Sequence, residues 1–179
     1  MAFTVSSTSI KGVFELRATT FFDHRGSFTN AFRADDPAIL ESWKSRNICQ
    51  VNVSRTEHCG TIRGLHMQAP PYAEAKIVQC LRGQVWDVAV DLRHDSPTYG
   101  HWHALKLSSL ESNALLIPEG CAHGFQTLER DSEILYLHSG QWAPHAELGI
   151  RWNDPKIAIK WPDEPSRLSE RDQALPFLE

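Results

Sequence analysis

The fold is decided by one stretch, Gly60-Thr-Ile-Arg-Gly-Leu-His-Met-Gln-Ala-Pro-Pro-Tyr-Ala-Glu-Ala-Lys-Ile-Val-Gln-Cys-Leu-Arg-Gly83. It places Arg63, His66 and Lys76 in strand-like sequence, and the run from Ile77 to Leu81 is rich in residues that favour strands. Polar groups buried in a sheet need polar surroundings. We therefore expect these three side chains to point into a cavity, with the rest of the chain as its scaffold.

The strand-like pattern continues on both sides of this stretch. Short alternating or apolar segments, separated by Gly, Pro, Asn, Asp or Ser, lie at 49–54, 85–92, 102–107, 114–117, 124–128 and 133–138. Many short strands with frequent turns favour a sandwich or barrel over β-α-β units. The sequence predicts an all-β barrel that forms a single domain over residues 1–179, a length sufficient for one substantial core.

Only short peripheral elements interrupt this pattern. A turn at Arg25-Gly26 between aromatic-rich segments predicts an early hairpin. Cap candidates followed by Pro37 predict a short helix that continues to about Arg46. After residue 141 the chain becomes rich in Pro and Trp, which indicates a loop-rich tail, with one or two helical turns within 166–174.

Composition and charge exclude several classes of partner. Lys and Arg total 18 against 22 Asp and Glu, which gives a net charge of −4 without a basic run, so we expect no nucleic-acid partner. No apolar run reaches the length of a bilayer span, and the N-terminus lacks a signal-peptide pattern, so we expect no membrane partner and a cytoplasmic location. We expect the four cysteines, which lack C-x-x-C spacing, to be reduced thiols that mostly pack in the core: Cys49, Cys59, Cys80 and Cys121.

Two motifs resemble those of the cupin superfamily. Gly60-x5-His66-x-Gln68, ending at Gly83, resembles its first motif, and the segment from Pro118 to His123 resembles its second, P-x-G-x-x-H. The resemblance implies a small jelly-roll barrel with both histidines facing inward. Metal-binding cupins have a second His at the position of Gln68 and a Glu near Lys76. Because a protonated Lys has no lone pair for a cation, we expect neither a metal nor another cofactor.

Further spaced motifs narrow the resemblance. They are Phe22-Asp-His-Arg-Gly26, Gln50-Val-Asn-Val-Ser54, Arg63-Gly-Leu-His-Met-Gln68, Lys76-Ile-Val, Asp87-Val-Ala-Val-Asp-Leu-Arg93, Ser96-Pro-Thr98, Ile117-Pro-Glu-Gly120, Ala122-His-Gly-Phe125 and Trp152-Asn-Asp-Pro155. Together they resemble the nucleotide-sugar epimerase family typified by dTDP-4-dehydrorhamnose 3,5-epimerase, over nearly the whole chain. The resemblance implies metal-free chemistry at C3 and C5 of a dTDP-4-keto-6-deoxyhexose. It also implies a homodimer with exchanged N-terminal strands.

Inverting a carbon next to a ketone requires a base, a group that stabilises the enolate oxygen, and an acid on the opposite face. His66 suits the base because an unperturbed imidazole titrates near the operating pH. Lys76 would stabilise the oxygen as it becomes negative. The resemblance further implies that Asp172 orients His66 and that Tyr136 is the general acid.

The resemblance also implies which residues bind the substrate. Arg63 and His123 would lie around the catalytic base and the phosphates. Arg25, Gln50 and Asn52 would bind the nucleotide, with Arg25 acting across the dimer. Trp142 would lie near the sugar or the nucleobase. Three positions depart from the family pattern: Trp142 replaces a frequent Tyr, Asn30 a nucleotide-contacting Glu, and Val53 a frequent His. They leave open the identity of the nucleobase and of the sugar.

Each assignment has a structural alternative. His66 could be a core histidine bonded to backbone. Asp172 could belong to a capping box that starts at Ser169. Tyr136 could be an ordinary strand aromatic and Lys76 an edge charge. Asp87 and Asp91 alternate with valines, and we expect them to share a polar face or bond loop backbone, without a catalytic role.

Three functional alternatives to a 3,5-epimerase remain open. The first is inversion at C3 alone on a dTDP-, CDP- or GDP-linked 4-keto sugar. The second is a metal-dependent cupin enzyme, against which Gln68 and Lys76 speak. The third is a catalytically silent module that binds a sugar nucleotide.

Overall fold

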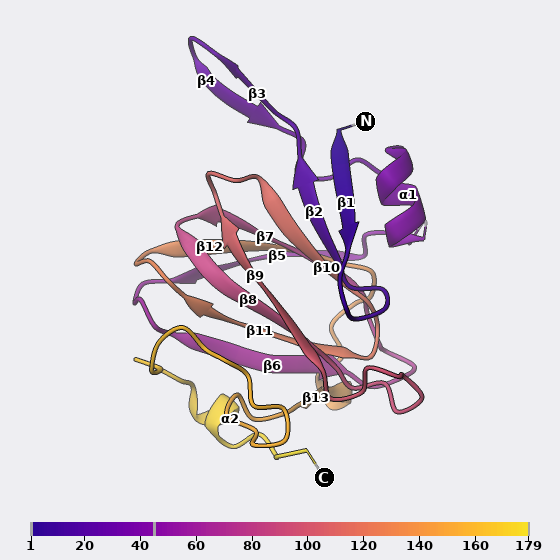
Figure 1. Ribbon diagram of the computed structural model, residues 1–179, viewed down its shortest axis with the longest axis vertical. Helices are drawn as coiled ribbons and strands as arrows, with labels where there is room; N and C mark the ends of the chain where they lie inside the picture. Colours follow the sequence, from indigo (N-terminus) through magenta and orange to yellow (C-terminus); the bar gives the residue numbers. More distant parts are fainter. Residues whose placement is uncertain (1, 45, 179) are drawn as a thin grey trace.

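Two facing antiparallel sheets make up the body of the protein in the computed structural model, which describes residues 2–44 and 46–178 (Figure 1). The six-stranded sheet has the order β1 (Phe3–Ser7), β2 (Phe14–Ala18), β10 (Asn113–Ile117), β7 (Lys76–Arg82), β12 (Ser132–His138) and β5 (Gln50–Thr56). The five-stranded sheet has the order β13 (Glu147–Gly149), β6 (Ile62–Gln68), β11 (Cys121–Thr127), β8 (Gln84–Asp91) and β9 (Trp102–Ser108). The prediction of an all-β fold is confirmed.

Side-chain alternation separates an inner from an outer face of the six-stranded sheet. On β7, Val78 and Cys80 belong to the core cluster between the sheets, whereas Ile77 belongs to the cluster on the outer face. On β12, Ile134 lies in the inner cluster and Leu137 in the outer one. This period of two means that Lys76, Tyr136 and His138 share the inner face with those apolar residues.

The N-terminal elements lie outside the two sheets. Helix α1 (Pro37–Trp43) begins at Asp36, whose side chain accepts a hydrogen bond from the Ala38 amide at 3.1 Å, and it covers the outer face of the larger sheet. Strands β3 (Thr20–Asp23) and β4 (Gly26–Thr29) form the predicted hairpin, which projects away from the body (Figure 1). The helix ends before Arg46, earlier than we expected, and position 45 lies outside the described residues.

The C-terminal tail covers the smaller sheet. Leu65 and Val90 pack with Ile150 and Ile157 of the tail on the outer face of that sheet. The tail is mostly irregular, as predicted, with a short 3-10 helix η1 (Pro144–Ala146) and helix α2 (Glu170–Gln173), which lies beside β6 (Figure 1). This docking brings residues near the end of the chain next to the strand that carries His66.

The cysteines fit the prediction only in part. All four are free thiols, and Cys80 and Cys121 are buried in the core. Cys49 and Cys59 are exposed, so the expectation of packing was wrong for these two. Within residues 2–44 and 46–178, no helix has the length and apolar character needed to cross a bilayer.

Strands β6 and β11 approach each other very closely at Gly64. This residue has φ of +121°, and a Cβ there would lie 2.6 Å from Gly124 Cα and 2.8 Å from the His123 carbonyl oxygen. Side chains do not tolerate such backbone contacts. The pair of glycines therefore permits the register that sets His66 opposite His123.

We predict that Gly64→Ala lowers the free energy of unfolding by about 3 kcal/mol, because backbone strain and overpacking add. Gly26→Ala is the matched control, since Gly26 also has a positive φ of +135° but nothing lies within 4 Å of its added Cβ. It should lose about 1 kcal/mol from strain alone. Urea denaturation measures both values, and equal losses would contradict the close approach.

Candidate active site

A cavity of about 410 Å³ opens between the two sheets at one end of the barrel. The side chains that line it are mostly polar: Gln50, Asn52, Val53, Ser54, Arg63, His66, Met67, Gln68, Glu74, Lys76, His123, Phe125, Tyr136, His138, Trp142 and Glu147. Eight of the ten predicted site residues are in this set, and Asp172 lies directly behind His66. Arg25 is the exception.

Strand register places the polar side chains in two facing groups. In the smaller sheet, His66 of β6 pairs with His123 of β11. In the larger sheet, His138 of β12 pairs with Lys76 of β7, and Tyr136 is opposite Asn52 of β5. An imidazole and a phenol thus enter one cavity from opposite sheets.

His66 is held by a buried carboxylate. Its Nε2 lies 2.7 Å from Asp172 Oδ1, and Asp172 Oδ2 accepts a hydrogen bond from the Gly64 amide at 3.2 Å. Burial alone would raise the pKa of Asp172, but the bond with His66 lowers it below its usual value. The carboxylate therefore stays ionised, fixes Nε2 as the protonated nitrogen and leaves Nδ1 of His66 free to accept a proton.

The alternative of a capping box is only half realised. Ser169 is the N-cap of α2, and its hydroxyl accepts a hydrogen bond from the Asp172 amide at 3.0 Å. In a complete capping box the Asp172 carboxylate would return to the Ser169 amide. It is instead bonded to Gly64 and His66, so the short helix serves to aim this carboxylate at the imidazole.

Lys76 is 6% exposed, so it is not the edge charge of the alternative reading. Its ammonium lies 3.5 Å from Glu74 Oε1. Burial lowers the pKa of Lys76, whereas the neighbouring Glu74 acts in the opposite direction. A cation in a site with little water is well suited to stabilise a developing oxyanion.

Tyr136 lies on the inner face of β12. Its hydroxyl is 3.2 Å from Ser54 Oγ, and its ring contacts that of His123 edge-on, with centroids 5.9 Å apart. Burial raises the pKa of Tyr136 above its ordinary value. The phenol therefore remains protonated at neutral pH and is available as a proton donor.

His123, which lines the cavity, belongs to a second imidazole–carboxylate pair that was not predicted. His123 Nε2 is 2.7 Å from Asp87 Oδ1, and both side chains are buried. Burial lowers the pKa of His123 and raises that of Asp87, although each partner opposes the shift of the other. Asp87 and Asp91 lie four residues apart on β8 and therefore on the same face of the strand, as expected, but the bond from Asp87 to His123 was not predicted. Asp91 does bond a loop, through the Arg93 amide at 3.1 Å.

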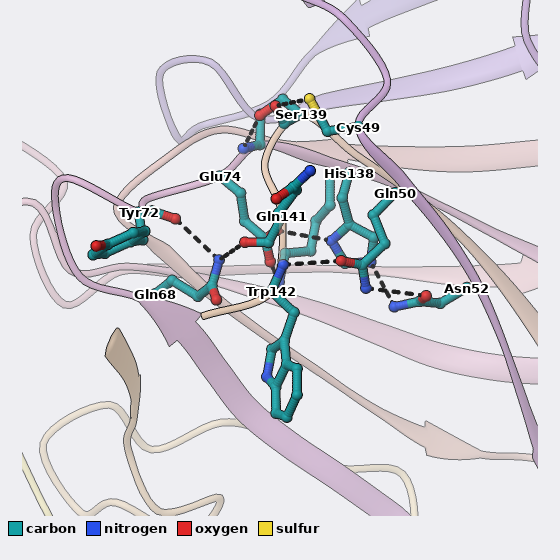
Figure 2. Close-up of polar contacts among 12 residues, drawn as sticks. Cys49, Gln50, Asn52, Gln68, Tyr72, Glu74, His138, Ser139, Gln141 and Trp142 are labelled. Atoms are coloured by element: carbon teal, nitrogen blue, oxygen red, sulfur yellow. Dashed lines mark hydrogen bonds and ion pairs between the residues drawn. The ribbon is translucent and has the colours of Figure 1, made fainter. Parts of the chain in front are cut away.

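The rim of the cavity is a network of amides. Gln50 Nε2 donates to Asn52 Oδ1 at 3.1 Å, and Gln50 Oε1 accepts from the Trp142 backbone amide at 2.9 Å. Figure 2 shows the indole of Trp142 pointing away from the polar side chains that hold its backbone. Trp142 is 59% exposed, so a large aromatic face is available to a ligand at the mouth of the cavity.

Gln68 and Arg63 are held by neighbouring protein groups. Gln68 Nε2 donates to the carbonyls of Tyr72 and Gln141 (Figure 2). Its Oε1 accepts from the Ala143 amide at 2.6 Å. Arg63 Nε donates to Thr56 Oγ1 at 3.1 Å. Gln68 therefore fastens the loop that carries Trp142, and it does not present a ligand to a metal. In the part of the chain that the structure describes, no three His, Cys, Asp or Glu side chains are grouped as a metal site.

Arg25 lies far from this cavity, at the tip of the β3–β4 hairpin. Its guanidinium bonds Asp23 at 2.6 Å, and its side chain is 78% exposed. Asn30 follows the same hairpin and does not line the cavity, whereas Val53 does. The structure therefore does not bring Arg25 together with the other predicted site residues.

The side chains that the sequence did not assign to the site include Glu74, Asp87 and His138. Each is the partner of a predicted residue or its neighbour across a strand pair. Glu74 lies two residues before Lys76, and such proximity of opposite charges was a usable signal. Asp87 and His138 could be placed only once the strand register was known.

Comparison with known proteins identifies the family of this chain. The family model described as dTDP-4-dehydrorhamnose 3,5-epimerase matches residues 7–179. A curated dTDP-4-dehydrorhamnose 3,5-epimerase of Sinorhizobium fredii is 40% identical over 178 residues, covering 96% of this chain and 88% of the relative.

Two solved structures are similar along nearly their whole length. The dTDP-4-dehydrorhamnose 3,5-epimerase of Bacillus anthracis, with TDP and pyrophosphate bound, has a TM-score of 0.93 at 38% identity, covering 99% of this chain and 100% of that one. The dTDP-6-deoxy-D-glucose-3,5-epimerase of Legionella pneumophila, in complex with dTDP-4-keto-L-rhamnose, has a TM-score of 0.92 at 34% identity. The match covers 98% of this chain and 92% of that one. With the same barrel, and with a family model that matches all but its first few residues, this chain belongs to the dTDP-4-dehydrorhamnose 3,5-epimerase family.

Proposed function

We propose that the protein epimerises a dTDP-4-keto-6-deoxyhexose at C3 and C5, through an enolate. The observation that carries this proposal is the entry of His66 and Tyr136 into one cavity from opposite sheets, with Lys76 buried beside Glu74 in the same cavity. Inversion needs a base and an acid on opposite faces of the sugar, and few other reactions need that arrangement together with a cation. Membership of the family supports the same substrate class.

His66, Lys76 and Tyr136 together account for every proton and electron pair that the reaction moves. His66 Nδ1 takes the proton from the carbon next to the ketone, and the C–H electron pair moves through the new C–C double bond to the oxygen at C4. The ammonium of Lys76 stabilises that negative oxygen. The Tyr136 hydroxyl then gives a proton to the opposite face of the same carbon, the ketone reforms, and His66 and Tyr136 exchange protons with solvent. The step at the second carbon repeats the first.

The nucleotide would bind at the rim of the cavity. Gln50 and Asn52 present amides there, and the exposed indole of Trp142 offers a stacking surface. Arg63 and His123 also line the cavity, and we assign them to the phosphates and to the surroundings of the base. A charged nucleotide sugar does not cross a bilayer unaided, which supports a cytoplasmic location for the enzyme.

The active unit would be a homodimer in which the β3–β4 hairpin reaches the partner. Exposed Phe21, Phe22 and Phe28 on this projecting hairpin, together with Val51 and Val53 on the edge strand β5, support this arrangement. Such apolar surface is normally covered. Because Arg25 lies at the tip of the hairpin, it would bind the nucleotide in the site of the other protomer.

We predict that the enzyme incorporates deuterium from D2O at both C3 and C5 of dTDP-4-keto-6-deoxyglucose, as followed by proton NMR. Exchange at C3 alone would indicate a 3-epimerase. Absence of exchange at either carbon, with this sugar and with its CDP and GDP counterparts, would overturn the proposal. Tight nucleotide binding without exchange would then identify a silent binding module.

Two variants separate the effect of the Asp172 carboxylate on His66 from its contribution to helix α2. We predict that Asp172→Asn lowers kcat roughly a thousandfold, because an amide no longer fixes the protonated nitrogen of His66 or stabilises its cation. Ser169→Ala is the control, since it removes only the cap and should cost about 1 kcal/mol of stability while kcat stays within a few fold. If both variants lose activity equally, Asp172 acts only through the helix.

A mixing experiment tests the exchanged hairpin. Arg25→Ala and His66→Asn should each be nearly inactive at substrate concentrations below KM. After unfolding and refolding together, mixed dimers carry one site with both native residues, so about a quarter of the wild-type activity should return. If Arg25 acts within its own chain, the mixture stays as inactive as its components.

A further inference from the structure

The cluster of Glu74, Lys76 and His138 is not accounted for by the reaction just described. Each of the two carboxylate oxygens of Glu74 lies near a different group, the Lys76 ammonium or the His138 imidazole. Oε1 lies 3.5 Å from the Lys76 ammonium, and Oε2 lies 3.2 Å from His138 Nδ1. All three side chains are buried, with at most 10% of each exposed.

The orientation of His138 follows from its other neighbour. The Asn52 amide nitrogen is 3.4 Å from His138 Nε2, so Nε2 accepts and Nδ1 carries the hydrogen. That hydrogen faces Glu74 Oε2, although the alignment is too poor for a regular hydrogen bond. Figure 2 shows this sequence of contacts, which runs from Glu74 through His138 to Asn52 and Gln50. Glu74 is therefore approached from two sides.

A buried ammonium needs a nearby anion to remain charged. Three carboxylates raise the pKa of Lys76, and they differ in whether another side chain already pairs with them. Asp87 of β8 is bonded to His123, burial raises its pKa, and none of the described residues gives its Oδ2 a hydrogen bond. Glu147 of β13 is paired with Arg171 at 3.0 Å. Glu74 is the carboxylate that remains for Lys76.

Glu74 itself is suited to stay ionised. Burial alone would raise its pKa, but His138 and Lys76 together lower it below its usual value. The other ionisable groups around the cavity are Arg63 and His66 of β6, His123 of β11 and Tyr136 of β12, and none of these supplies an anion. Glu74 is thus the pocket carboxylate best placed to balance the charge of Lys76.

We propose that Glu74 is a positioning residue that keeps Lys76 charged and in place for the substrate oxygen, and that His138 holds Glu74 by its second oxygen. This inference rests on the proposed function, since it concerns the cation of the same site. Glu74 touches neither the reacting carbons nor the base. It acts through Lys76, and its removal should change when Lys76 loses its proton.

The test is the pH profile of kcat. In Glu74→Gln, which keeps the shape of the side chain, Lys76 loses its proton at lower pH. The alkaline limb of the profile should therefore move down by about one pH unit, the size expected for loss of an opposite charge at this distance. Glu74→Asp keeps the charge, so its alkaline limb should lie close to the wild-type position. His138→Leu should give a smaller shift in the same direction and add nothing to Glu74→Gln, because it acts through Glu74.

Glu147→Gln is the matched control, because it removes a second pocket carboxylate whose charge Arg171 already balances. Its alkaline limb should move much less than that of Glu74→Gln. An unchanged limb in Glu74→Gln, or an equal shift in Glu147→Gln, would overturn the inference. NMR titration of 15N-labelled lysine side chains, with Lys76→Arg to assign the signal, reads the same shift without substrate. The titration therefore tests this inference even if the proposed function fails. Failure of the proposed function would appear separately, as a wild-type enzyme that exchanges no deuterium into the sugar.

Discussion

Burial of several ionisable side chains between two sheets is the constraint on which this structure depends. A charge inside a barrel is stable only if each group meets a partner of suitable sign. The protein meets this condition with three separate pairings: His66 with Asp172, His123 with Asp87, and Lys76 with Glu74. Each pairing also fixes the orientation of a side chain that lines the cavity.

The pairings follow from strand register, and register follows from packing. Because side chains alternate along β7 and β12, a residue such as Val78 or Ile134 that enters the apolar core brings Lys76, Tyr136 and His138 to the same inner face. The close approach at Gly64 does the same for β6 and β11. A slip of one residue would turn these groups outward, so the stability of the barrel and the geometry of the site have a common origin.

The sequence predicted those parts of the site that depend on local pattern. The inward position of His66 and Lys76 could be inferred because strand-like sequence and spaced motifs are visible in the chain, whereas Tyr136 was assigned only through the resemblance. Asp172 could be matched to His66 only through the resemblance, since its own surroundings equally suggest a capping box. Asp87 and His138 escaped because their partners are brought next to them by strands distant in sequence. Arg25 was matched to the nucleotide through the resemblance alone, and in this chain it is exposed at the tip of the hairpin and does not line the cavity.

The central claim is that His66 and Tyr136 act on opposite faces of one ring. It is tested most directly by following a Tyr136→Phe variant by NMR in D2O. With the base intact and the acid absent, His66 should return a deuteron to the face from which it took the proton, so deuterium enters at C3 with retention of configuration and inversion is lost. Inversion at the wild-type rate in this variant would contradict the account.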